Sequence, residues 1–94
     1  MRDMSAPDLD TRRKRLRYRS WHRGCKETDL IFGPFADAHV AGLSEAEISS
    51  FEALLDEADN DLFEWLTGRT RPPERVLTEL WRRLESFNRA KFAP

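Results

Sequence analysis

Apolar residues recur at helical spacing along most of the chain, and there is almost no sign of the two-residue alternation of a β-strand. The first predicted helix begins at a cap, Asp8 or Asp10, and runs to about His22, where Gly24 ends it. The residues expected to anchor it are the apolar ones along its length: Leu9, Leu16, Tyr18 and Trp21.

A second helix is predicted over about residues 26–41, because apolar residues starting at Ile31 recur at i, i+4 and i+7. Gly33 and Pro34 lie inside this helix. A proline there removes a backbone hydrogen bond and clashes with the preceding turn. We therefore expect a kink at this point, or a break into two short helices.

The third predicted helix opens with a capping box, in which Ser44 and Glu47 bond to each other's backbone. Asp59 is expected to cap a short fourth helix over residues 61–67, which Gly68 ends.

A fifth helix is predicted with Pro73 in its first turn, because proline suits that position. Its apolar stripe runs from Val76 to Phe87. The loops between the predicted helices are short, which favours an all-α fold, a compact bundle of about five helices.

The chain has 94 residues, enough for one hydrophobic core. We expect a flexible N-terminal end at residues 1–8 and a single helical-bundle domain at 9–92. With 39% hydrophobic residues the chain is too apolar to be disordered. Its longest apolar run, Leu30 to Phe32, is far too short for a membrane span.

The net charge of −1 conceals a segregation of charge along the chain. Residues 11–26 hold eight basic side chains and no acidic one, whereas residues 27–68 hold eleven acidic side chains and no Lys or Arg. The basic block could meet phosphates, an acidic partner or the acidic middle of the same chain.

No catalytic constellation and no metal site is expected. One cysteine and two histidines match no zinc pattern, and no phosphate-binding glycine loop is present. A thiolate–imidazole pair of Cys25 and His22 is conceivable, but no third group is evident to orient the base. A small helical protein of this kind is expected to work by binding rather than as an enzyme.

The junction from Trp21 to Glu27 combines an aromatic ring, cations, a glycine and an acid. The plain interpretation is that Gly24 ends a helix while Arg23 and Glu27 form a weak local pair. The helix around Trp65 is more apolar than one buried face requires, and Trp65 is a side chain of the type that anchors interfaces.

These motifs, in this order, closely resemble the SdhE family of succinate dehydrogenase assembly factors, also called flavinators. Arg23 to Glu27 reads R-G-x-x-E and is followed by Thr28-Asp29-Leu30, and downstream come Pro34-Phe35, Leu43-Ser44-Glu45 and a D-L-F-x-W-L stretch ending at Leu66. The resemblance covers roughly residues 11–90. It implies a small five-helix bundle, in agreement with the helix pattern.

The resemblance also implies a function. Members of this family promote covalent attachment of FAD to a histidine of the flavoprotein subunit of succinate dehydrogenase and, in some bacteria, of fumarate reductase. FAD would therefore belong to the partner, and no cofactor is expected to stay bound to this chain. The residues expected to bind the partner are Arg23, Gly24, Glu27, Asp29 and Trp65.

The competing interpretation is a nucleic-acid-binding or antitoxin-like regulator that uses the basic N-terminal helix. Against it, the overall charge of −1 and the acidic middle repel phosphate. With no leader rich in Arg and Ser, the sequence is typical of a bacterial cytoplasmic protein, and its single cysteine suits a reducing compartment.

Overall fold

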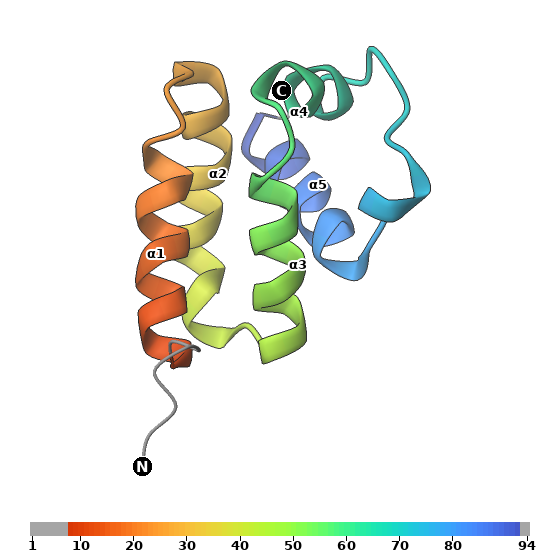
Figure 1. The fold of residues 1–94 in the computed structure, drawn as a ribbon. Helices are drawn as coiled ribbons and strands as arrows, with labels where there is room; N and C mark the ends of the chain where they lie inside the picture. The colour runs from red at the N-terminus through yellow and green to blue at the C-terminus, as the bar shows by residue number, and fades with distance from the viewer. Residues whose placement is uncertain (1–7, 93–94) are drawn as a thin grey trace.

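In the computed structural model, which describes residues 8–92, the chain forms five α-helices and two single-turn 3-10 helices. Helices α1 (Leu9–Trp21), α2 (Lys26–His39) and α3 (Glu45–Leu55) lie side by side (Figure 1). Helix α4 (Asp59–Leu66) lies across one end of them, and α5 (Glu79–Phe92) packs against α2 and α3. The described residues contain no β-strand, so the predicted all-α bundle is confirmed.

Two of the predicted helix starts are confirmed by their hydrogen bonds. The Asp8 carboxylate accepts from the Thr11 amide at 2.8 Å and so caps α1. The capping box of α3 is complete, since the Ser44 hydroxyl accepts from the Glu47 amide and the Glu47 carboxylate accepts from the Ser44 amide. Apart from Asp8, the predicted flexible end lies outside the described residues.

Of the two alternatives expected at Pro34, the break is wrong, because α2 continues through the proline as one helix from Lys26 to His39, and the kink stays a prediction. The physical reason is packing: Phe32, Phe35 and Ala36, on either side of the proline, are fully buried. Their burial outweighs a proline cost of about 3 kcal/mol.

Two further helix boundaries differ from the prediction. Helix α4 begins at Asp59 itself, with Ala58 at the cap position and no side-chain cap. Pro73 precedes a separate 3-10 turn at Glu74–Val76, and α5 starts only at Glu79. The Thr78 hydroxyl accepts from the Trp81 amide and thereby begins α5.

The core is built mainly from α2, α3 and α5. Phe35 lies at its centre, with ring centroids 5.6 Å from both Phe51 and Phe87. The side chains with at most 1% exposure include Leu16, Phe32, Phe35, Val40, Leu43, Ile48, Phe51, Leu62, Leu80, Trp81 and Leu84. None of the described helices has the length and hydropathy needed to cross a bilayer.

Of the four predicted anchors of the first helix, Leu16 is buried and Leu9 is partly buried against the core, whereas Tyr18 is exposed, which corrects the expectation for Tyr18. The Trp21 ring lies against Gly33 of α2, where any Cβ would overlap it. The indole N–H donates to the Asp37 carboxylate at 3.2 Å. Trp21 therefore fastens α1 to α2 from outside the core.

Part of the basic block pairs with the acidic middle of the same chain, as one of the three interpretations predicted. Arg12 makes a two-pronged contact with Glu52 of α3, at 2.8 and 3.1 Å. Arg19 reaches Asp56 just beyond the end of α3, at 2.8 Å. These pairs explain how a helix with few buried apolar residues is held against the bundle.

Candidate functional site

The junction between α1 and α2 faces the start of α4 at one end of the bundle. We call residues 23–29, together with Asp59, Asn60 and Phe63 of α4, the corner. Both α2 and α4 begin here, so the partial positive charge of two helix N-termini is directed at the same region.

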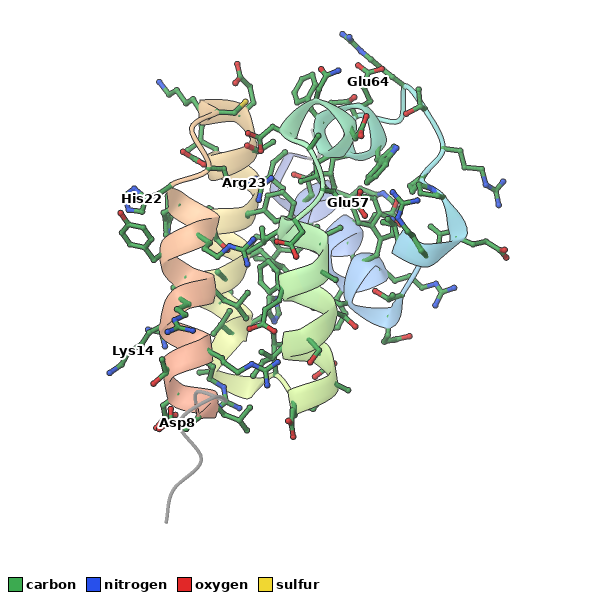
Figure 2. All side chains as sticks on the ribbon, in the orientation of Figure 1. Asp8, Lys14, His22, Arg23, Glu57 and Glu64 are labelled. Atoms are coloured by element: carbon green, nitrogen blue, oxygen red, sulfur yellow. The ribbon has the colours of Figure 1, made fainter. Side chains whose placement is uncertain are left out.

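Arg23 holds the corner together through an internal network, and Figure 2 shows its side chain directed into the bundle. Its Nε donates to Asp59 at 2.5 Å, and its two terminal nitrogens donate to the carbonyl oxygens of Leu55 and Glu57 at 2.6 and 2.8 Å. The guanidinium carbon lies 5.8 Å from the centre of the Phe32 ring. With a side chain only 10% exposed, Arg23 links the start of α2 to the turn between α3 and α4.

The corner's backbone turn depends on Gly24. Its φ of +93° lies in the left-handed region, which side chains of L-residues rarely adopt. No atom would lie within 4 Å of a Cβ placed there, so the position opens onto solvent. Another molecule can therefore approach the backbone closely at Gly24.

Two carboxylates of the corner have different roles. Asp29 accepts from the Arg23 amide at 2.8 Å and fixes the turn. Glu27 is exposed and forms no ion pair with any described residue. The Cys25 thiol donates to it at 3.1 Å, and this bond, together with the Glu27 amide, lowers the pKa of its carboxyl group. Glu27 is therefore an ionised acceptor available to another molecule.

A shallow hollow of about 330 Å³ opens beside these groups. It is lined by Cys25, the N-cap residue of α2, and by Glu27 in the first turn of that helix. Asp59, Asn60 and Phe63 of α4 line the other side. The half-buried Phe63 ring gives the hollow an apolar wall between polar edges. Such a surface suits a protein contact that combines one apolar anchor with a few hydrogen bonds.

Four of the five predicted partner-binding residues, Arg23, Gly24, Glu27 and Asp29, come together at the corner. The alternative pairing of Arg23 with Glu27 is wrong, because Arg23 bonds to Asp59 instead. The fifth residue, Trp65, lies elsewhere: it is 9% exposed and packs edge-on against Trp81, with ring centroids 6.4 Å apart. Its role in partner binding stays a prediction.

Two residues of the corner, Asp59 and Phe63, are not predicted from the sequence to belong to the site. The sequence predicts Asp59 as a helix cap, whereas the Asp59 carboxylate is the ion-pair partner of Arg23. The sequence favours Trp65 as the aromatic anchor of an interface, whereas Phe63 is the aromatic residue that lines the hollow. The signal for Asp59 was present in the opposite charges of the basic and acidic blocks.

The conceivable thiolate–imidazole pair does not form. His22 stacks on Tyr18, with ring centroids 4.2 Å apart, and the Cys25 thiol bonds to Glu27. Among the described residues, no three side chains of His, Cys, Asp or Glu come together in a way that could hold a metal ion.

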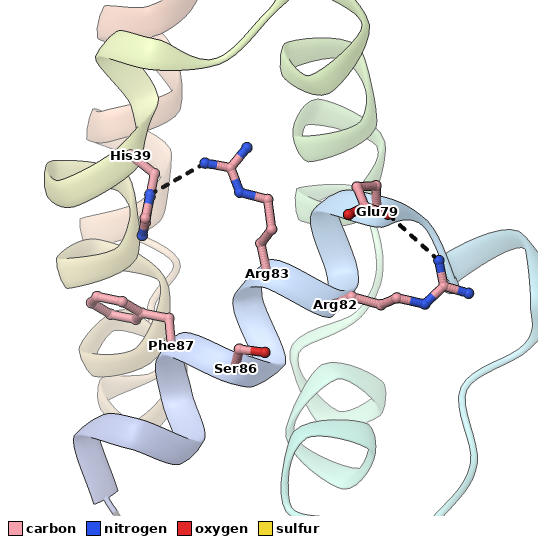
Figure 3. A pocket seen from close by; sticks show the side chains of 6 residues that line it. All are labelled: His39, Glu79, Arg82, Arg83, Ser86 and Phe87. Carbon is pink, nitrogen blue, oxygen red and sulfur yellow. Dashed lines mark hydrogen bonds and ion pairs between the residues drawn. The ribbon is translucent and has the colours of Figure 1, made fainter.

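A second hollow, of about 460 Å³, lies at the other end of α2 (Figure 3). His39 packs there between Phe35 and Phe87, and Arg83 approaches its ring nitrogen at 3.4 Å. Burial, and then the charge of Arg83, lowers the pKa of His39. Arg83 also pairs with Glu47 at 2.7 Å, so its charge is already matched within the chain.

Comparison with known proteins shows which family the chain is similar to. Residues 14–88 match the family model described as "Flavinator of succinate dehydrogenase". The chain is 36% identical over 84 residues to "FAD assembly factor SdhE" of Acetobacter pasteurianus, which covers 89% of this chain and 77% of that protein.

Two mitochondrial relatives are both named "Succinate dehydrogenase assembly factor 2". The one from Candida glabrata is 38% identical over 87 residues, which is 88% of this chain and 57% of that protein. The one from Dictyostelium discoideum is 34% identical over 73 residues, covering 78% of this chain and 52% of that protein. The chain thus spans just over half the length of these two mitochondrial relatives.

Proposed function

Because this chain belongs to the succinate dehydrogenase flavinator family, we propose that it is an assembly factor for succinate dehydrogenase. It binds the flavoprotein subunit of that enzyme, here called the client, and promotes covalent attachment of FAD to it. The relative named as an FAD assembly factor supports the role in FAD attachment, and the relative named as a succinate dehydrogenase assembly factor supports the choice of client.

The corner is the proposed contact surface. The observation that carries this is the Glu27 carboxylate, which is exposed and forms no ion pair with any described residue, on a turn held by the Arg23 network. Gly24 and Glu27 would touch the client, and Arg23 and Asp29 would hold them in position. A preformed turn binds at low entropic cost, because little has to be ordered on association.

The proposed action is positioning and not catalysis by this chain. The corner offers hydrogen-bond acceptors, an open glycine and an aromatic wall to a surface of the client. By holding the client in one arrangement, the chain favours the geometry in which the client's own histidine and FAD react. FAD is held by the client, and this chain retains no cofactor.

We place this action in the bacterial cytoplasm, where a reducing environment keeps the single cysteine, Cys25, as a thiol. Whether the flavoprotein of fumarate reductase is a second client is decided by the same assay, with that subunit in place of the first.

The test combines the purified full chain with apo-flavoprotein and FAD, followed by denaturing gel electrophoresis and detection of covalent flavin by fluorescence. Glu27→Gln removes the charge from the corner, and Glu79→Gln is its control, an exposed carboxylate in the first turn of α5. We expect Glu27→Gln to slow flavin attachment about tenfold and the control to match the wild type. Equal rates with and without the wild-type chain would overturn the proposed function.

A further inference from the structure

The basic residues of α1 divide between two faces of the helix. Those directed toward the bundle bond to the same chain: Arg12 to Glu52, Arg13 to the Val40 and Leu43 carbonyl oxygens, and Arg19 to Asp56. Lys14, Arg15 and Arg17 are exposed and form no ion pair with any described residue. Figure 2 shows Lys14 directed away from the bundle.

An aromatic ring lies among the unpaired cations. Tyr18 is one helical turn beyond Lys14 and is 67% exposed, the largest exposed fraction among the described large hydrophobic side chains that reach the surface. Its ring is held by stacking on His22. Lys14, Arg15 and Tyr18 also line a shallow depression of about 560 Å³. We call Lys14, Arg15, Arg17 and Tyr18 the outer α1 face.

The outer α1 face leads directly to the corner. His22, on which Tyr18 stacks, is the residue before Arg23, and Lys14 to His22 spans about 12 Å at the rise of an α-helix. An interface of standard size, about 800 Å² per partner, is wide enough to cover both surfaces. A molecule bound at the corner would thus lie within reach of the unpaired cations.

We infer that the outer α1 face is a second docking surface, for an acidic surface of the client that carries an apolar side chain opposite Tyr18. This inference rests on the proposed function and adds to it the chemistry of the partner. Three cations around one rigid aromatic ring are complementary to carboxylates grouped around an apolar residue. The cations steer the client, and Tyr18 supplies contact area at low entropic cost.

A nucleic acid fits the same observations less well. Residues 27–68 hold eleven acidic side chains and the chain as a whole carries a charge of −1, so a long polyanion gains little net attraction. A compact acidic surface on a folded protein can meet the outer α1 face and avoid that region. A duplex of 20 base pairs therefore serves as the competing probe.

The experiment measures the Kd between the full chain and the flavoprotein subunit from 50 to 300 mM NaCl. The first variant reverses the charge of the outer α1 face by the three substitutions Lys14→Glu, Arg15→Glu and Arg17→Glu. The control Arg71→Glu/Arg82→Glu/Arg89→Glu changes the net charge by the same amount at exposed positions elsewhere. We expect the first variant to bind about tenfold to a hundredfold more weakly at low salt and the control to bind within about threefold of wild type.

The possible outcomes distinguish a failure of the proposed function from a failure of the inference alone. If the wild type does not bind the flavoprotein, the proposed function and the inference both fail. If it binds and the two variants behave alike, only the inference fails. If the wild type binds the duplex more tightly than the flavoprotein and the first variant loses that binding, a nucleic acid is the partner and the inference is overturned.

The salt dependence of wild-type binding tests the inference without any substitution. A Kd that rises steadily with salt supports charge pairing at the interface, whereas a flat dependence contradicts it. Tyr18→Ala is a further variant that leaves the charge unchanged. Tyr18→Ala should weaken binding at every salt concentration, because it removes the aromatic contact and leaves the electrostatic attraction of the cations unchanged.

Discussion

The two ends of α2 carry similar groups in different arrangements. Each end has an arginine, a neighbouring carboxylate and a hollow at the surface. At the N-terminal end Arg23 is directed inward to carbonyl oxygens, and Glu27 is exposed and forms no ion pair with any described residue. At the C-terminal end Arg83 pairs with Glu47 and approaches His39, which lies between two phenylalanine rings.

The comparison shows that the size of a hollow does not identify the binding site. The larger hollow, beside His39, is lined by arginines that are matched by carboxylates of the same chain. The smaller hollow, at the corner, has an ionised acceptor, Glu27, that forms no ion pair with any described residue. An exposed charge that forms no ion pair with any described residue, on a turn held by hydrogen bonds, is the better indication of a partner.

The largest expected effect comes from breaking the network beneath the corner. Arg23→Met removes the donor to two backbone carbonyl oxygens and leaves Asp59 with a 3.4 Å hydrogen bond from Thr28 in place of its ion pair. This should lower the free energy of unfolding by about 3 kcal/mol. Its control is Arg19→Met, which removes the exposed pair with Asp56 and should cost about 0–1 kcal/mol. Urea denaturation followed by circular dichroism measures both.

Equal costs for the two methionine variants would contradict the structural role of Arg23. A stable Arg23→Met variant that no longer binds the client would show instead that Arg23 contacts the partner directly.

The next largest effect is the loss of flavin attachment on substitution of Gly24, and a matched glycine variant separates backbone strain from loss of partner contact as its cause. Gly24→Arg and Gly68→Arg both place a side chain at a positive φ with open space around it, so each should cost about 1–2 kcal/mol of stability. Gly68 lies beyond the end of α4 and not at the corner. We expect only Gly24→Arg to abolish support of flavin attachment, measured at a temperature where both variants are folded.

If both glycine variants lose flavin attachment to the same extent, strain alone accounts for the loss. The open approach at Gly24 would then have no part in binding the client.

The smallest effect is a pH dependence at the other end of α2. The pKa of His39 is lowered in the folded state, by burial and then by Arg83, so the unfolded chain binds a proton more readily near pH 6.5. Stability should therefore fall as pH drops through 6.5, down to the lowered folded pKa. His39→Gln should flatten the stability profile between pH 5.5 and 7.5 without changing flavin attachment. An unchanged profile would contradict the effect of burial on His39.

Local signals in the sequence predicted the helices well. The Asp8 cap and the Ser44–Glu47 capping box each depend on residues three apart, and both are confirmed. Pro34 misled the prediction, because its local cost is outweighed by packing against α3 and α5 that the sequence does not display.

The site was predictable only in part. The R-G-x-x-E pattern placed Gly24 and Glu27 together, since they are close in sequence. The hydrogen-bond partners of the Arg23 side chain lie 32 to 36 residues away, and no local pattern specifies contacts at that range. For the same reason the sequence could not distinguish Trp65, which is buried against Trp81, from Phe63, which lines the hollow.

The most direct test uses Cys25, the only cysteine of the chain, which lies on the wall of the corner's hollow. The rate of Cys25 alkylation by iodoacetamide is followed by mass spectrometry for the free chain and for the chain saturated with the flavoprotein subunit. If the corner is the contact surface, the rate in the complex falls to a small fraction of the free rate. An unchanged rate in a fully formed complex would contradict the assignment of the corner as the surface that binds the client.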